Sequence, residues 1–354
     1  MKALVLAGGK GTRLRPLTHT IPKQLVPVAN RPVVHYVIDQ IVNCGILDIG
    51  IVVSPDTAIQ IRDSLSNNEW GANFTYIPQE SPLGLAHAVK VSRPYLQDDS
   101  FVMYLGDNLV GEDITQYVHS FNEADSDAVI LLKSVPDPRL FGVAEINDNG
   151  TVLKLIEKPK DPPSNLALMG IYVFSAYIHK AIEKIHPSNR GELEITDAIQ
   201  QIINEGHQVK SFIVDSWWLD TGKKDDLLAA NQVILDELCF RKIDGDVDPN
   251  SNIRGQVRIS VETRIVRSHI EGPSNIGNHT LIEDSTIGPH TSIGNNCTIQ
   301  ESVLTNCVIL DNAQIIGVKN LEDSIIGRSS IIRHQPSIPH TLKLMVGDDN
   351  EVLI

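Results

Sequence analysis

The sequence predicts an α/β protein in which a doubly wound, mostly parallel sheet is followed by a short parallel β-helix. Over the first two-thirds of the chain, short apolar runs alternate with segments of helical periodicity, and this alternation is typical of a doubly wound sheet. In the last third, isoleucine and valine recur at a step of six residues, which is typical of a hexapeptide-repeat β-helix. The length of 354 residues favours two domains.

The strands expected in the first domain are apolar runs, several of them continuous, as in strands that are covered on both faces. They comprise residues 3–7, 49–53, 74–77, 101–105, 128–132, 143–146, 153–157, 168–174 and 209–214. The first helix is expected to begin at Pro32, a favourable first helical residue, and to end near Gly45. Further helices are expected over residues 85–93, 195–204 and 225–239. Functional loops in such sheets follow the carboxyl ends of the strands.

A polar, turn-rich stretch at residues 241–252 is expected to be a linker between the two domains. The predicted domains are therefore residues 1–240 and 253–354, the second with about four triangular coils ending near Ile326. Residues 341–354 hold two apolar runs around a turn and are expected to form a hairpin that caps the β-helix. The expected inward positions are Ile253, Ile259, Ile265, Ile270, Ile276, Ile282, Ile287, Ile293, Ile299, Val303, Ile309 and Ile315.

The distribution of charge indicates a small anionic ligand rather than a nucleic acid. The net charge of −14 opposes binding to a nucleic-acid backbone, which needs a basic field. The first 38 residues nevertheless contain no Asp or Glu and carry six basic residues. These are Lys2, Lys10, Arg13, Arg15, Lys23 and Arg31. A local cationic pocket of this kind attracts a small anion, although an ordinary solvated basic face is the alternative.

The cysteines and the apolar runs predict a cytoplasmic protein without a membrane segment. Four scattered cysteines without a Cys-x-x-Cys pair suggest neither a disulfide framework nor a zinc site. The apolar run at the start is too short for a secretory leader. No run approaches the roughly 20 apolar residues that cross a bilayer.

A glycine-rich loop follows the first predicted strand, in the sequence Leu6-Ala7-Gly8-Gly9-Lys10-Gly11-Thr12-Arg13-Leu14. Its glycines let the backbone approach a ligand, and successive N–H groups can cradle an anion. Lys10 and Arg13 add charge that can neutralise phosphate oxygens. Neither the Walker A spacing nor the dinucleotide-binding GxGxxG spacing is present. On its own the loop could equally be a strand-to-helix turn.

The loop continues into Pro16-Leu17-Thr18 and then Pro22-Lys23-Gln24-Leu25. The pattern GGxGTRLxPLT followed by a Pro-Lys pair resembles the signature of the sugar-1-phosphate nucleotidyltransferases, a family with a Rossmann-like catalytic fold. Pro-Lys-Gln-Leu is similar to the glucose-1-phosphate thymidylyltransferases within it. The resemblance extends to about residue 231. The repeats that follow resemble the left-handed β-helix of the long form of these enzymes.

The resemblance implies roles for residues around the nucleotide. Arg13 is implied as catalytic, holding the β and γ phosphates. The residues implied in nucleotide binding are Leu6, Gly8, Gly9, Gly11, Thr12, Lys23, Gln79, Pro82 and Gly84. The Gln79 amide offers a donor and an acceptor that match the imide edge of thymine or uracil. From the residue alone, Gln79 could also be the exposed end of a strand.

The resemblance also implies a sugar-phosphate side and a metal site. Lys158 is implied as catalytic and as a ligand of the sugar phosphate, in a set with Gly142, Glu157 and Tyr172. Asp107 and Asp220 are implied as Mg²⁺ ligands, since two carboxylates plus phosphates suit this ion. The alternative for Asp220 is an N-cap for the following helix. The motif at residues 190–197 matches the family, without a defined role for Arg190.

The implied reaction is nucleotidyl transfer from dTTP to glucose-1-phosphate, giving dTDP-glucose and pyrophosphate, in a homo-oligomer. A uridylyltransferase that uses UTP, or another nucleotide-sugar pyrophosphorylase, remains an alternative. A non-catalytic nucleotide-sugar-binding module is a second alternative, which the presence of Arg13, Lys158 and both aspartates disfavours. An acyltransferase role for the β-helix is disfavoured because the repeats carry no long inserted loop, and fold alone does not give function.

Overall fold

The computed structural model describes residues 1–123, 126–147 and 150–334. The chain divides into two compact units. The first unit contains residues 1–10 and 33–219, and the second contains residues 11–32 together with the chain from Asp220 onward. The end of the glycine loop, from Gly11, and the segment that follows it therefore belong to the same unit as the β-helix.

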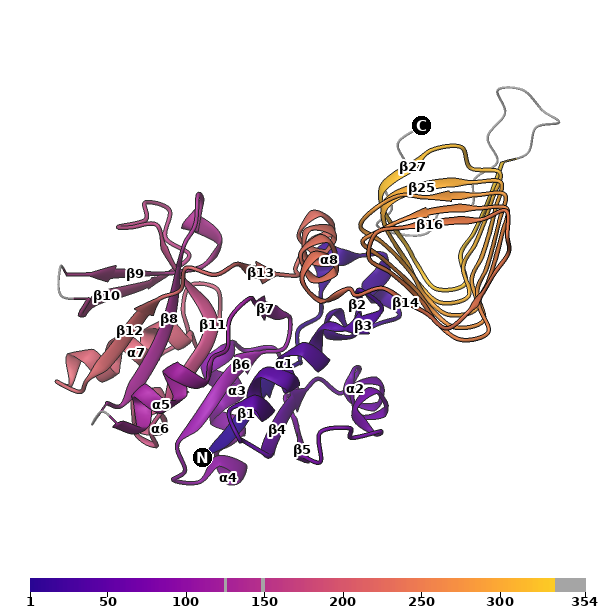
Figure 1. Cartoon of the computed structure of the whole chain (residues 1–354). Helices are drawn as coiled ribbons and strands as arrows, with labels where there is room; N and C mark the ends of the chain where they lie inside the picture. The colour runs from indigo at the N-terminus through magenta and orange to yellow at the C-terminus, as the bar shows by residue number, and fades with distance from the viewer. Residues whose placement is uncertain (124–125, 148–149, 335–354) are drawn as a thin grey trace. The chain divides into compact units, whose positions relative to one another are not determined.

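The first unit is built on a nine-stranded mixed sheet with the order β10-β9-β11-β6-β1-β4-β5, in which β8 also pairs with β11, and β12 pairs with β8 (Figure 1). Strands β6, β1, β4 and β5 pair in parallel, whereas β11 is antiparallel to its neighbours. The strands are β1 (Lys2–Leu6), β4 (Asp48–Val53), β5 (Asn73–Pro78), β6 (Phe101–Leu105), β8 (Ala128–Ser134), β9 (Gly142–Ile146), β10 (Val152–Glu157), β11 (Leu166–Phe174) and β12 (Val209–Ile213). Each predicted strand is present; β6 has its predicted ends, and the others have one or both ends shifted by one or two residues.

Helices cover both faces of this sheet, which confirms the doubly wound prediction. Phe101 and Met103 of β6 pack in one apolar core with α3, α6 and α7, while alternation along the strand turns Val102 to the other face. The helices are α1 (Val33–Asn43), α2 (Ala58–Leu65), α3 (Leu85–Val91), α4 (Arg93–Leu96), α5 (Thr115–Glu123), α6 (Tyr177–Ile182) and α7 (Ile195–Asn204). The short strands β7 (Asn108–Val110) and β13 (Trp218–Asp220) complete the elements around the sheet.

The carboxyl ends of the parallel strands meet at one edge of the sheet. The Ala7 N–H donates to the Val52 carbonyl at 2.8 Å, and the Gly106 N–H donates to the Leu6 carbonyl at 3.0 Å. The Gln79 N–H donates to the Val53 carbonyl at 2.8 Å. These bonds bring the loops after β1, β5 and β6 together, as expected for the ligand-binding edge of an open α/β sheet.

A buried histidine should make the first unit sensitive to acid. His179 in α6 is 6% exposed, its ring stacks on Phe101, and its Nε2 has no hydrogen-bond partner. Burial, with a smaller effect of Arg93, lowers the pKa of His179 from 6.5 to about 4. The unfolded chain therefore binds this proton first as the pH falls, so stability is lost between pH 6.5 and about 4.

We expect that loss to be at most about 3.5 kcal/mol, from the shift of 6.5 to about 4 at roughly 1.4 kcal/mol per pKa unit. Thermal unfolding of His179→Leu between pH 7.5 and 4.5 should change less with pH than unfolding of the wild type. His119→Gln, which changes an exposed histidine of α5, is the matched control and should follow the wild type. Equal pH dependence of His179→Leu and the wild type would contradict this assignment.

The second unit contains the β-helix, a helix α8 (Lys224–Leu238), and the segment 11–32 with 3-10 turns at Thr12–Leu14, Leu17–His19 and Lys23–Leu25. The segment ends in a hairpin of β2 (Pro27–Val28) and β3 (Arg31–Pro32). The stacked coils appear in orange and yellow in Figure 1. Their strands are β14 (Lys242–Ile243), β15 (Asp246–Val247), β16 (Asn252–Arg254), β17 (Val257–Ile259), β18 (Arg264–Val266), β19 (His269–Glu271), β20 (Ser274–Ile276), β21 (Leu281–Glu283), β22 (Thr286–Ile287), β23 (Thr291–Ile293), β24 (Thr298–Gln300), β25 (Val303–Ile309), β26 (Gln314–Ile316), β27 (Leu321–Ile326) and β28 (Ile331–Arg333).

The coil length explains the slipping repeat in the sequence. Ile253 pairs with Ile270 and Ile270 with Ile287, so each coil advances 17 residues, as two steps of six and one of five. The predicted left-handed β-helix is confirmed, but one inward position is wrong. Leu304 rather than Val303 pairs with Ile287 and is fully buried, because β25 runs straight through this corner.

The first coil begins earlier than the repeat suggests, since β14 and β15 lie within residues 241–252 and pair with β17 and β18. The hairpin predicted over residues 341–354 lies outside the described residues. All four cysteines are free thiols. No helix in the described part of the chain has the length and apolar character to cross a membrane.

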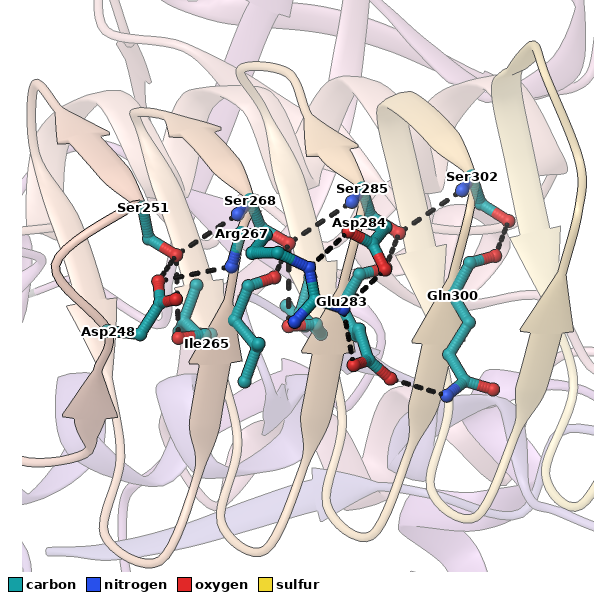
Figure 2. A network of polar contacts seen from close by, with 12 residues as sticks. Asp248, Ser251, Ile265, Arg267, Ser268, Glu283, Asp284, Ser285, Gln300 and Ser302 are labelled. Atoms are coloured by element: carbon teal, nitrogen blue, oxygen red, sulfur yellow. Dashed lines mark hydrogen bonds and ion pairs between the residues drawn. The ribbon is translucent and has the colours of Figure 1, made fainter.

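A ladder of serine hydroxyls runs along one corner of the β-helix (Figure 2). The Ser268 N–H donates to Ser251 Oγ at 3.0 Å, the Ser285 N–H to Ser268 Oγ at 3.1 Å, and the Ser302 N–H to Ser285 Oγ at 3.1 Å. The Ser285 hydroxyl in turn donates to the Glu283 carbonyl at 2.7 Å. At each corner the chain turns, and these backbone N–H groups no longer pair with a neighbouring strand. The serine hydroxyls accept their hydrogen bonds instead.

We expect Ser285→Ala to destabilise the β-helix. Ser285 is 4% exposed, and its removal leaves the Ser302 N–H without its acceptor. A buried donor left unsatisfied costs about 1–3 kcal/mol. Chemical unfolding of the variant should show this loss. Ser324→Ala, which removes a less buried hydroxyl bonded to the Glu322 carbonyl, should cost less, and equal losses would contradict the ladder's role.

Candidate active site

The glycine loop lies against the glutamine that follows β5. A Cβ atom added to Gly8 would lie 3.4 Å from Gln79 Oε1 and 3.5 Å from the Ser54 N atom. The loop after β1 therefore passes close to the ends of β4 and β5. Leu6, the last residue of β1, is 7% exposed. The structure thus brings together three of the residues predicted to bind the nucleotide: Leu6, Gly8 and Gln79.

The Gln79 amide is oriented by the protein itself. Its Nε2 donates to the Gly84 carbonyl at 3.2 Å and lies 3.0 Å from His87 Nδ1. Burial, together with the Lys90 charge, lowers the pKa of His87, so at neutral pH this ring is uncharged and its Nδ1 can accept. Both amide protons are thereby used, and Oε1 is the atom that faces Gly8. Gln79 is therefore presented as a hydrogen-bond acceptor.

Gly84 is required by a close approach of two segments. It has a φ of +102°, and an added Cβ would lie 2.4 Å from the Leu193 carbonyl oxygen. The Leu193 N–H donates to the Leu83 carbonyl at 2.8 Å, so residues 83–86 are bonded to the stretch that precedes α7. Pro82, another residue predicted to bind the nucleotide, lies exposed in the same loop.

Asp107 lies directly beyond β6 at the carboxyl edge of the sheet. It is 5% exposed, and its Oδ1 accepts from Asn108 Nδ2 at 3.2 Å. Asn108 Oδ1 accepts in turn from Trp218 Nε1 at 2.7 Å. The carboxylate is thus nearly buried beside a fixed amide, next to the Gly106 N–H that bonds the end of β1.

A second group of predicted residues gathers at the end of β10. A Cβ added to Gly142 would lie 3.2 Å from Glu157 Oε2, and Lys158 Nζ lies 3.6 Å from Glu157 Oε1. Lys158 has a φ of 42°, and its N–H donates to the Phe141 carbonyl at 3.0 Å. The left-handed turn lets the lysine leave the strand, and its side chain is exposed.

Arg190 joins this group, although the sequence did not define a role for it. Its guanidinium lies 3.3 Å from Glu157 Oε1, 3.0 Å from Glu192 and 3.5 Å from Glu194. Burial raises the pKa of Glu194, and the Arg190 charge opposes that shift. Thr196 Oγ1 donates to Glu157 Oε2 at 3.4 Å. The motif at residues 190–197 was the available signal, but spacing alone could not show that it turns toward Glu157.

Tyr172 differs from the other predicted sugar-side residues. Its side chain is 3% exposed, it belongs to the apolar core, and its ring stacks on Phe174 at 5.7 Å. Burial, and secondarily the Glu157 charge, raises the pKa of its hydroxyl well above the ordinary value. The ring therefore packs within the sheet core, whereas Glu157 is partly exposed and Lys158 is exposed.

In the second unit, Arg13 and Asp220 come together. The Arg13 guanidinium lies 3.8 Å from Asp220 Oδ2, and a Cβ added to Gly222 would lie 2.7 Å from Arg13 Nη2. Gly222 therefore makes room for the guanidinium. Burial raises the pKa of Asp226, and the charges of Lys223 and Arg13 oppose that shift. The arginine is half exposed and held beside carboxylates.

Gly11 and Lys23 also meet in this unit. Gly11 has a φ of +61°, and an added Cβ would lie 3.0 Å from Lys23 Cβ and 3.0 Å from Thr18 Cγ2. Thr18 Oγ1 donates to the Gly11 carbonyl at 2.6 Å. Next to Lys23, Gln24 is 1% exposed, and its Oε1 has no hydrogen-bond partner among the described residues.

The family model for nucleotidyl transferases matches residues 2–237. The chain therefore belongs to the nucleotidyl transferase family.

Particular relatives cover the whole chain. The sequence is 46% identical over 355 aligned positions to a glucose-1-phosphate thymidylyltransferase of Streptomyces griseus, covering 100% of this chain and 99% of the relative. It is 45% identical to an enzyme of the same name from Streptomyces antibioticus, again over 100% of this chain and 99% of the relative. A Bacillus anthracis protein solved in complex with sucrose superposes with a TM-score of 0.63 at 35% identity, over 68% of this chain and 98% of its own.

Proposed function

We propose that this protein transfers the thymidylyl group of dTTP to glucose-1-phosphate, giving dTDP-glucose and pyrophosphate. The observation that carries the proposal is 46% identity to a glucose-1-phosphate thymidylyltransferase over the whole chain, the β-helix included. Groups described separately in the two units support it, since they comprise an acceptor for a base, cations for phosphates and a carboxylate for sugar hydroxyls.

The reaction is a single in-line displacement. An oxygen of the sugar phosphate attacks the α-phosphorus of the triphosphate, forming a new P–O bond. The bond from the α-phosphorus to the bridging oxygen breaks, and pyrophosphate leaves with its electron pair. Because the attacking phosphate is already anionic, the step needs no general base. Catalysis then consists of positioning and charge neutralisation.

Arg13 and Lys23 bind the β and γ phosphates together with the N–H groups of the glycine loop, including Gly9, Gly11 and Thr12. Asp220, 3.8 Å from the guanidinium, keeps Arg13 oriented before the nucleotide arrives. Lys158 binds the sugar phosphate and holds its attacking oxygen. Glu157 accepts from sugar hydroxyls, and its contact with Arg190 fixes the carboxylate for this purpose.

Gln79 reads the base. Its Oε1 accepts the imide N–H of thymine, since the amide protons are used by Gly84 and His87. A cytosine ring has no proton at that position, so the acceptor excludes it. Thymine and uracil share the imide edge and differ by one methyl group, which is worth about 1–3 kcal/mol in an apolar pocket. UTP is therefore the competing substrate.

The proposed metal is Mg²⁺, held by Asp107 and Asp220. The donor set fits, because both are carboxylates, and oxygen is the ligand that Mg²⁺ prefers alongside water and phosphate. No group of three or more His, Cys, Asp or Glu in the described residues forms a metal cage. A site of two carboxylates completed by substrate phosphates needs no such cage. When bound, the ion supplies positive charge at the α-phosphate.

Two further expectations are part of the proposal. The protein acts as a homo-oligomer, which light scattering checks. It acts in the cytoplasm, and its four free thiols agree with a reducing compartment.

The test is product identification. The protein is incubated with dTTP, glucose-1-phosphate and Mg²⁺. The products are separated by anion-exchange chromatography and identified by mass spectrometry. We expect dTDP-glucose and pyrophosphate in equal amounts. Labelled pyrophosphate should not enter dTTP when glucose-1-phosphate is omitted, because no covalent nucleotidyl-enzyme forms. Exchange under that condition would contradict the single displacement, and binding without any product would favour the non-catalytic module.

A further inference from the structure

The turn of the β2–β3 hairpin is bonded to the β-helix. Its two central residues, Ala29 and Asn30, both have positive φ, 48° and 63°, as in the two-residue turns that join twisted strands. Asn30 Nδ2 donates to the Asn275 carbonyl at 3.0 Å and to the Ile293 carbonyl at 2.7 Å. Asn275 Nδ2 donates back to the Ala29 carbonyl at 2.7 Å. Two successive coils, through β20 and β23, thus hold one turn.

Asn231 of α8 ties the same turn to the same coils from a second direction. It is fully buried, and its Oδ1 accepts from the Ala29 N–H at 2.9 Å and from Ser292 Oγ at 2.6 Å. Its Nδ2 donates to the His290 carbonyl at 2.8 Å. A buried amide on α8 that bonds two other segments, the turn and the stretch 290–292, fixes their positions relative to the helix, because each lost bond would leave an unsatisfied polar group.

The segment held in this way carries groups that face the triphosphate in the proposed function. Lys23 lies shortly before the hairpin and packs against Gly11, which directly precedes Thr12 and Arg13. A Cβ added to Gly327, in the last coils, would lie 3.7 Å from Leu17 Cδ1, so the β-helix also contacts the middle of the segment. The contacts extend from Leu17 to Asn30 along one stretch of chain.

We propose that the β-helix positions the nucleotide-binding segment, and that Asn30, Asn231 and Asn275 are positioning residues for Lys23 and Arg13. This inference rests on the proposed function of those two cations. Phosphate contacts depend on geometry, and a displacement of about 1 Å can cost on the order of 100-fold in rate. The β-helix therefore affects triphosphate binding although its own residues do not touch the nucleotide.

The experiment compares Asn30→Gly, Asn275→Ala and the double variant with the wild type. Glycine adopts positive φ without strain, so Asn30→Gly keeps the turn and removes only the amide. We expect the dissociation constant and KM for dTTP to rise by about 3- to 10-fold in each single variant, since the loosened turn no longer holds Lys23 and Arg13 in place. The KM for glucose-1-phosphate should stay unchanged. The double variant should fall short of the product of the single effects, because both amides hold the same turn through separate bonds to backbone carbonyls.

Gln300→Ala is the matched control. It removes an amide on the same β-helix that bonds Glu283 at 2.9 Å and has no bond to the hairpin. It should leave both KM values at wild-type levels. The inference would be overturned if Gln300→Ala raised the KM for dTTP as much as Asn30→Gly and Asn275→Ala do. It would also be overturned if those two variants raised the KM for both substrates, or if they lowered thermal stability without changing dTTP affinity. Isothermal titration calorimetry measures the dissociation constant of dTTP independently of turnover. A wild type that binds dTTP but forms no product would contradict only the proposed function.

Discussion

Asp107→Asn is expected to abolish most turnover while leaving the fold intact. The substitution keeps the shape of the side chain and an oxygen that can accept from Asn108 Nδ2. In the wild type this nitrogen lies 3.2 Å from Asp107 Oδ1. It removes the negative charge that would bind Mg²⁺. A metal ion at a transferring phosphoryl group contributes several kcal/mol of charge stabilisation. Since each 1.4 kcal/mol is about tenfold in rate, we expect a fall in kcat of roughly 10²- to 10³-fold.

Asp113→Asn is the control for this variant. Asp113 is an exposed carboxylate whose Oδ1 accepts from the Thr115 N–H at 2.8 Å, and asparagine caps a helix equally well. It should retain wild-type turnover. The melting temperature of both variants and the Mg²⁺ concentration for half-maximal rate are measured alongside. A near-wild-type rate for Asp107→Asn at low Mg²⁺ would remove Asp107 from the metal site.

Lys158→Gln is expected to weaken the use of glucose-1-phosphate specifically. The lysine directly follows β10 in a left-handed conformation and is exposed, with Glu157 Oε1 3.6 Å from its Nζ. Glutamine keeps most of the chain length but cannot provide the positive charge. Hydrogen bonds to charged groups contribute about 1.5–3 kcal/mol. The loss should be roughly 10- to 150-fold in kcat/KM for glucose-1-phosphate, with little change in dTTP affinity.

Lys154→Gln provides the comparison on the same strand. Lys154 is an exposed residue of β10 that the site does not use, so its variant should behave as the wild type. Equal losses in the two variants would indicate a general electrostatic effect. A change confined to dTTP affinity would indicate that Lys158 binds the nucleotide and not the sugar phosphate.

The fold could be predicted largely because its pattern is strong and local. Each apolar run predicted as a strand is one, and α7 spans its predicted residues 195–204. Helix α2 was missed because only Ile61 and Leu65 of its residues are buried, too few to show a helical period. The inward position at Val303 was wrong because the step from Leu304 to Ile309 has five residues, where the earlier coils have six. Hydropathy does not distinguish Val303 from Leu304.

The candidate site could be predicted as a set of residues but not as a set of contacts. The motifs indicated Gln79, Gly84, Glu157 and Lys158, because these are clustered in the sequence. Arg190 reaches Glu157 only through the tertiary fold, which no spacing along the chain encodes. The grouping of residues 11–32 with the β-helix is likewise a long-range result, set by buried amides rather than by an apolar pattern.

The most direct measurement is pyrophosphate release over a grid of dTTP, UTP, ATP and GTP against glucose-1-phosphate and mannose-1-phosphate, with Mg²⁺ and with EDTA. The account predicts Mg²⁺-dependent release with dTTP and glucose-1-phosphate as the best pair, UTP second, and no release in EDTA. A purine triphosphate as the best donor would contradict the role of Gln79. No release with any pair would contradict the proposed function itself.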